Sequence, residues 1–183
     1  MKSRSFISVV SILFGLSSLA FAQNSVSSDI HIAKGKKVSR NISTVSGDVF
    51  VGSGARIKGG VTAVSGDIEI GSKAFVQNVE VVSGNISIGK GASAAQLETV
   101  SGDIHLYEKS GVSRSIETVS GDVNCDSGSD ITKNIITVSG DIELDDSRLR
   151  GDLKTVSGDI SLFNGSMIDG DIIINRKSNV VLF

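Results

Sequence analysis

A four-residue motif, Val-Ser-Gly-Asp, recurs along the chain at intervals of 18 or 19 residues. A repeat this short can bury its apolar residues only against neighbouring repeats, so the period predicts a solenoid of stacked coils. A degenerate copy at Ser27–Ile30 precedes seven clear ones, which makes about eight coils. The glycines of the clear copies are separated by 19, 18, 18, 19, 19 and 18 residues and are Gly47, Gly66, Gly84, Gly102, Gly121, Gly140 and Gly158.

A second period, of six residues, lies inside each repeat. Three steps of six fill one coil, and the apolar pattern of a helix is absent, so we predict an all-β, single-domain, triangular β-solenoid with three short strands per coil. In the first strand, Ile68 and Ile70 are expected to point inward, while Asp67 and Glu69 point outward. The other residues at steps of six are also predicted to point inward, and they include Val45, Val64, Val82, Val100, Val119, Val138 and Val156.

The Ser-Gly-Asp segments are predicted to form one column of sharp corners. Glycine tolerates the positive φ that such a corner requires. We expect each aspartate to accept hydrogen bonds from backbone N–H groups of its own corner, in an Asx turn. The alternative is a row of weak Ca²⁺ sites, because hard cations prefer carboxylate oxygens. Asn85 interrupts the column, which otherwise contains Asp48, Asp67, Asp103, Asp122, Asp141 and Asp159.

The N-terminus has the pattern of a secretory signal peptide over residues 1–22. Lys2 and Arg4 precede an apolar stretch, and Ala20-Phe21-Ala22 is a small-x-small cleavage site. Residues 23–26 are then a short leader, and residues 27–183 the solenoid domain. Cleavage would remove two basic residues and no acidic one, which changes the formal net charge from −2 to −4. We therefore expect an exported protein with no nucleic-acid partner and no transmembrane segment after cleavage.

Few residues suit catalysis. His31 and His105 are predicted to be outward-facing surface residues four coils apart, about 19 Å, too far to share a metal ion. Cys125 occupies an inward position and is interpreted as a buried apolar side chain, with a reactive thiol as the alternative. No catalytic, metal-binding or cofactor-binding residue is predicted, and the chain is not expected to be an enzyme.

Threonine and serine recur two residues apart, from Thr44/Ser46 to Thr155/Ser157. If the valine between them points inward, both hydroxyl groups face outward in a flat array. Such ladders are similar to those of ice-binding solenoids, but the array is interrupted at Ala63 and Val81. The ordinary preference of these residues for exposed strands and corners is the interpretation that we favour.

Three segments resemble the bactofilin family of polymer-forming proteins, namely residues 68–76 (Ile-Glu-Ile-Gly-Ser-Lys-Ala-Phe-Val), 56–61 and 167–172. The Ser-Gly-Asp-Ile repeats are equally similar to an exported adhesin family of β-strand repeats. The bactofilin resemblance implies a right-handed triangular β-helix that assembles end to end. Bactofilins are typically cytoplasmic, and the predicted signal peptide departs from that.

Together these features predict an exported structural or adhesin-like solenoid in the periplasm, in the cell envelope or outside the cell. Its expected partner is another copy of itself, bound end to end, with an envelope or surface component as a further partner. Six basic residues against one acidic residue in positions 34–60, and ten acidic against four basic in positions 117–159, favour such a contact. The alternative is a monomeric, non-catalytic solenoid that binds Ca²⁺, a glycan or ice.

Overall fold

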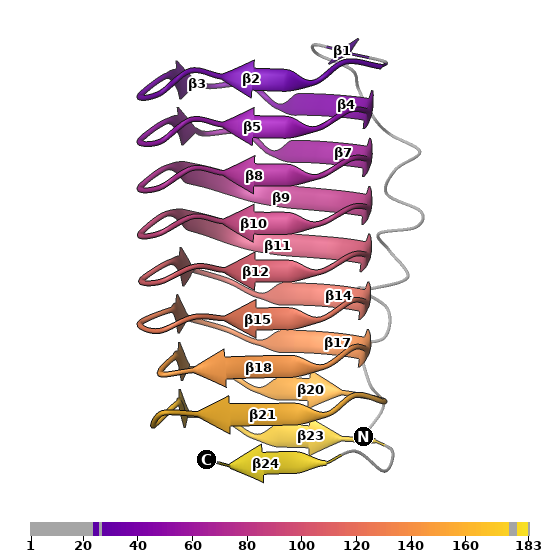
Figure 1. Cartoon of the computed structure of the whole chain (residues 1–183), viewed down its shortest axis with the longest axis vertical. Helices are drawn as coiled ribbons and strands as arrows, with labels where there is room; N and C mark the ends of the chain where they lie inside the picture. Colours follow the sequence, from indigo (N-terminus) through magenta and orange to yellow (C-terminus); the bar gives the residue numbers. More distant parts are fainter. Residues whose placement is uncertain (1–23, 26, 176–178, 183) are drawn as a thin grey trace.

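The computed structural model describes residues 24–25, 27–175 and 179–182. These residues form 24 β-strands and no helix, and the strands stack in parallel into one rod (Figure 1). The predicted all-β solenoid of about eight coils is therefore confirmed. The predicted signal peptide, residues 1–22, lies outside the described part of the chain.

Each coil has three walls. The front wall is a nine-stranded sheet in which each strand pairs with the equivalent strand of the neighbouring coil. Its strands are β2 (Ile30–Ile32), β5 (Val49–Val51), β8 (Ile68–Ile70), β10 (Ile86–Ile88), β12 (Ile104–Leu106), β15 (Val123–Cys125), β18 (Ile142–Asp145), β21 (Ile160–Phe163) and β24 (Val180–Leu182).

The second and third walls join into a 15-stranded sheet, because β9 (Phe75–Ser83) and β11 (Ser93–Ser101) run through both without a break. The rest of the second wall consists of β3 (Lys37–Val38), β6 (Arg56–Ile57), β13 (Gly111–Val112), β16 (Asp130–Ile131), β19 (Arg148–Leu149) and β22 (Met167–Ile168). The rest of the third wall consists of β1 (Asn24–Ser25), β4 (Ile42–Ser46), β7 (Val61–Ser65), β14 (Ile116–Ser120), β17 (Ile135–Ser139), β20 (Leu153–Thr155) and β23 (Ile172–Ile174).

Equivalent residues of successive coils lie side by side. Ile68 pairs with Ile86, and Ile86 pairs with Ile104. In Figure 1 the front-wall strands run from right to left, the chain returns behind them, and it descends with each turn. The coil is therefore right-handed, as parallel crossover connections nearly always are.

The core is a stack of aliphatic side chains. Ile68, Ile70 and their equivalents from β5 to β18 are fully or almost fully buried, while Glu69 is exposed, as predicted. Cys125 is also buried in its predicted inward position, and burial, followed by the nearby Asp126 carboxylate, raises the pKa of its thiol to about 12. A thiol with so high a pKa is a poor nucleophile at neutral pH, so Cys125 acts as a small apolar residue.

The valine of each Val-Ser-Gly-Asp motif does not point inward, and this prediction was wrong. In β7, Val61 and Ala63 are buried, so strand alternation places Val64 on the outer face. The inward series therefore takes its one step of seven residues across the Ser-Gly-Asp corner, from Ala63 to Ile70. The predicted series had placed this longer step before the corner, between Ile57 and Val64. The same half-buried outward column continues through Val45, Val82, Val100, Val119, Val138 and Val156.

Part of the predicted leader belongs to the sheet. Asn24 pairs with Ser43, and Ser25 pairs with Thr44, so β1 covers the edge of β4 at the N-terminal end of the third wall. The edges of β2 and β3 in the other two walls have no preceding strand among the described residues. The described residues therefore cover the N-terminal end of the rod over one wall of three.

Candidate functional site

The aspartates of the Ser-Gly-Asp corners form a continuous hydrogen-bonded ladder. The Oδ1 atom of each residue accepts from the backbone N–H group of its equivalent one coil later, as in the bond from the Asp141 N–H to Asp122 Oδ1 (2.8 Å). Eight such bonds, of 2.7–2.9 Å, join nine residues, namely Asp29, Asp48, Asp67, Asn85, Asp103, Asp122, Asp141, Asp159 and Asn179.

These bonds correct the predicted Asx turn. Each carboxylate accepts from the backbone N–H group of the next corner and not from its own corner, so the aspartates connect coils. Asn85 fits the ladder because its amide oxygen accepts from Asp103 in the same way. At the last step, the Asn179 backbone N–H and then its side-chain amide lower the pKa of Asp159, since they stabilise the charged form. The column is thus a structural device.

The glycines of these corners are required by contact more than by conformation. Only Gly47, Gly66, Gly84 and Gly102 have φ in the left-handed region, at 139–149°. Gly121, Gly140 and Gly158 lie outside that region, so the prediction of positive φ was wrong for three of the seven. At all seven, however, a Cβ atom would lie only 2.0–2.7 Å from the backbone of the preceding coil.

The threonines beside the valine column are buried, contrary to the predicted outward array. Thr99, Thr118, Thr137 and Thr155 point into the core, and their hydroxyl oxygens have no hydrogen-bond partner there. Val81 occupies the same column one coil before Thr99. Threonine therefore fills a valine-shaped space, and the flat hydroxyl array that an ice-binding surface requires is not presented on this wall.

Both histidines lie on the outer face of the front wall, as predicted. The His31 ring stacks on Phe50, with centroids 4.8 Å apart, and the His105 ring stacks on Tyr107 at 4.2 Å. His105 Nε2 also lies 3.0 Å from Asp126 Oδ1. Within residues 24–25, 27–175 and 179–182, no group of three His, Cys, Asp or Glu side chains is placed to hold a metal ion.

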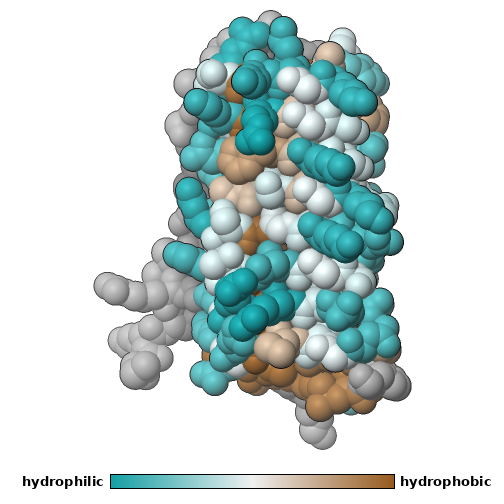
Figure 2. Space-filling view, turned by 90° about the vertical axis from the view of Figure 1, so that its left-hand side faces the viewer, coloured by the Kyte–Doolittle hydropathy of each residue, from teal (hydrophilic) through white to brown (hydrophobic). Residues whose placement is uncertain are grey.

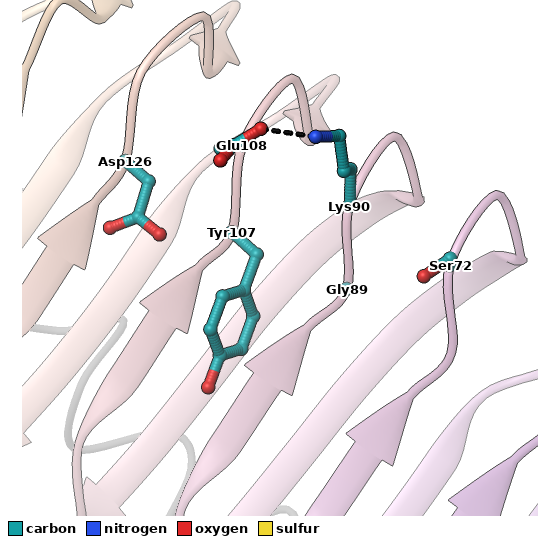
Figure 3. A pocket seen from close by; sticks show the side chains of 6 residues that line it. All are labelled: Ser72, Gly89, Lys90, Tyr107, Glu108 and Asp126. Carbon is teal, nitrogen blue, oxygen red and sulfur yellow. Dashed lines mark hydrogen bonds and ion pairs between the residues drawn. The ribbon is translucent and has the colours of Figure 1, made fainter.

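A surface hollow beside Tyr107 was missed by the sequence reasoning. It has a volume of about 280 Å³ and lies where the front wall meets the loops toward the second wall (Figure 3). Lys90 and Glu108 form an ion pair across two adjacent loops. The sequence does contain an indication of this hollow. Tyr107 directly follows a front-wall strand, at a position that is glycine in the three preceding coils. The lining residues are Ser72, Gly89, Lys90, Tyr107, Glu108 and Asp126.

A second file of carboxylates lies on the outer face of the third wall. Glu80, Glu98 and Glu117 are neighbours in register on β9, β11 and β14. Burial, followed by the Glu117 and Glu80 charges, raises the pKa of Glu98 to about 7. Burial also raises the pKa of both neighbours. Unlike the ladder aspartates, which accept from backbone N–H groups, Glu98 accepts from the side-chain amide of Gln96.

The two ends of the rod differ in polarity. The last described coil exposes core-type side chains, including Val180 (41% exposed) and Leu182 (70% exposed), whereas core residues of internal coils are buried. Figure 2 shows hydrophobic residues gathered at this lower end, with mostly hydrophilic residues above. At the opposite end the exposed basic residues are Lys34, Lys36, Lys37, Arg40, Arg56 and Lys58.

These features define a right-handed parallel β-solenoid with one structural corner per coil. Residues 76–182 match the family model described as Toastrack DUF4097. This match covers more than half of the 183 residues, and the chain belongs to the Toastrack DUF4097 family. No curated protein and no solved structure matches the chain. In the part of the chain that the structure describes, no helix is long and apolar enough to cross a membrane.

Proposed function

We propose that this protein is an exported, non-catalytic scaffold of the cell envelope that self-associates through the ends of its rod. The observation that carries the proposal is the apolar C-terminal face. Val180 and Leu182 pair with Ile160 and Leu162 of the preceding coil and so continue the inward file. With no further coil over them among the described residues, they present both apolar surface and an unpaired strand edge, which templates another strand.

The partner surface of this contact is the N-terminal end of a second copy. There, the edges of β2 and β3 have no preceding strand among the described residues, while β1 covers the third wall. Charge supports the same orientation, because Lys34, Lys36 and Lys37 are exposed at that end, whereas residues 117–159 in the far half contain ten acidic residues against four basic ones. A head-to-tail contact between different surfaces leaves a free surface of each kind, so it propagates into filaments instead of closing.

Light scattering of the purified protein across a salt series tests the proposal. We expect a mass above that of the monomer at low salt and a lower mass at high salt, because exposed charges are screened within about 8 Å at physiological ionic strength. A single monomeric mass at every salt and protein concentration would refute self-association and leave a solitary surface-binding rod.

Two matched variants locate the contact. The double substitution Val180→Ser/Leu182→Ser removes apolar side chains from the end face and is expected to give monomers. The control Val181→Ser changes the residue between them, which pairs with Ser161 and points outward, and is expected to assemble as the parent does. Equal assembly of both variants would place the contact elsewhere than the C-terminal face.

A further inference from the structure

The hollow beside Tyr107 combines an aromatic side chain with a glycine, Gly89. Tyr107 follows β12, and its equivalents in the three preceding coils are Gly52, Gly71 and Gly89. The glycine positions are closely packed, since a Cβ on Gly89 would lie 2.7 Å from the Ile70 carbonyl oxygen. In Figure 3 the Tyr107 side chain lies between Gly89 and Asp126.

Tyr107 is held in place although it is 43% exposed. The His105 ring lies nearly parallel to it, at an interplanar angle of 13°, and His105 in turn contacts Asp126. An exposed aromatic side chain that is already oriented loses little conformational entropy when a ligand packs against it. Such residues provide large contact area in binding sites on protein surfaces.

The side chains at the rim of the hollow offer hydrogen-bond donors and acceptors, and their positive and negative charges nearly balance. The Lys90 ammonium group pairs with the Glu108 carboxylate, and the same contact lowers the pKa of Glu108, so that this carboxylate is ionised at neutral pH. Ser72 and Asp126 add a hydroxyl group and a second carboxylate. Because the cation and the anion are already paired, the rim selects strongly for neither an anionic nor a cationic ligand.

We propose that this hollow is a saccharide-binding subsite, which accepts one neutral sugar ring of a surface polysaccharide. A sugar ring has an apolar C–H face that packs against Tyr107, and hydroxyl groups that both donate to carboxylates and accept from an ammonium group. The volume of about 280 Å³ falls just below the range of drug-sized pockets, about 300–1,000 Å³, and suits one ring of a longer chain. The proposal goes beyond end-to-end assembly and stands without it.

Tyrosine fluorescence gives a direct test, because the chain has one tyrosine and no tryptophan. Every fluorescence change therefore reports on Tyr107. The purified protein is titrated with cellohexaose, chitohexaose and maltohexaose. We expect a saturable change with at least one of them, at a dissociation constant of about 1 mM or tighter. No saturable change with any of the three would overturn the proposal.

Isothermal titration calorimetry of variants then assigns the site. Tyr107→Ala is expected to weaken binding about tenfold, and Tyr107→Phe, which keeps the ring, by less than about threefold. Phe50→Ala is the matched control, since Phe50 also stacks on a histidine of the front wall but does not line the hollow. Circular dichroism confirms that each variant is folded. Equal loss of affinity in Phe50→Ala and Tyr107→Ala, or no loss in either, would place the sugar elsewhere and overturn the proposal.

Discussion

Glycine occurs at two corners of the coils, for different physical reasons. In the Ser-Gly-Asp corner, Gly102 lies so close to the preceding coil that a Cβ atom would be 2.0 Å from the Gly84 carbonyl oxygen. In the loop between the front and second walls, Gly54 has φ +70° and open space around its Cα atom. Lys73 takes the left-handed position of that loop one coil later, with φ 57°.

The difference explains why one corner is uniform along the chain and the other is not. Contact between backbones excludes every side chain, so all seven clear Ser-Gly-Asp corners keep glycine. A left-handed φ only disfavours other residues, by about 1–2 kcal/mol, so lysine is accepted in the loop. A corner position that is glycine in all seven clear coils thus indicates steric exclusion of side chains. A position where another residue sometimes replaces glycine indicates only a conformational preference.

The largest expected effect comes from adding a methyl group to the tight corner. Gly102→Ala and Gly140→Ala should each lower the free energy of unfolding by about 3 kcal/mol or more, because neighbouring coils must move apart. Gly102 has φ +147°, and Gly140 lies outside the left-handed region, yet both would meet a backbone oxygen at 2.0 Å. Similar losses in both variants, measured by urea denaturation, would identify contact as the cause.

Gly54→Ala is the control for this pair. It adds the same methyl group in open space, at the left-handed φ alone, and should cost about 1 kcal/mol. Losses of equal size at Gly54 and Gly140 would contradict the distinction between the two corners.

A smaller effect is expected in the aspartate ladder. Asp122→Ala leaves the Asp141 N–H without its side-chain acceptor and should cost about 1 kcal/mol, the usual net value of one hydrogen bond. Asp122→Asn keeps an amide oxygen in the same place and should be nearly neutral, as Asn85 is in the native chain. Urea denaturation midpoints of the two variants provide the comparison. Equal destabilisation by both would mean that the carboxylate charge, and not its acceptor oxygen, stabilises the corner.

The smallest effect concerns the glutamate file, Glu80, Glu98 and Glu117, on the outer face of the third wall. The pKa of Glu98 is raised from 4.5 to about 7 in the fold, so its contribution to stability is fully present below pH 4.5 and lost as the pH rises through about 7. The melting temperature should therefore fall between pH 5 and pH 8. In Glu98→Gln this fall should shrink, whereas Glu69→Gln, on the exposed front wall, should keep it. A fall of unchanged size in Glu98→Gln would show that other groups cause it.

The sequence period was enough to predict the fold, the inward pairs such as Ile68 and Ile70, and the outward histidines. The prediction for the valine column failed because a period of six does not show at which corner a 19-residue coil takes its extra residue. The alternating burial of Val61 and Ala63 in β7 shows that the longer step crosses the Ser-Gly-Asp corner. The ladder bonds join residues 18–20 positions apart, so their direction depends on coil stacking and not on local turn propensity. The hollow depends on which residues of adjacent loops meet, as Lys90 and Glu108 do.

Residue-for-residue stacking also has a consequence for how the length of such a rod can change. Because each corner accepts a bond from its equivalent in the next coil, a duplicated or deleted unit of 18 or 19 residues meets the same partners as before. Insertions of other sizes would shift every later residue out of register with its equivalent in the preceding coil. The length of such a rod therefore varies in steps of one coil, about 4.8 Å each, so that the number of repeats sets the distance between its two ends.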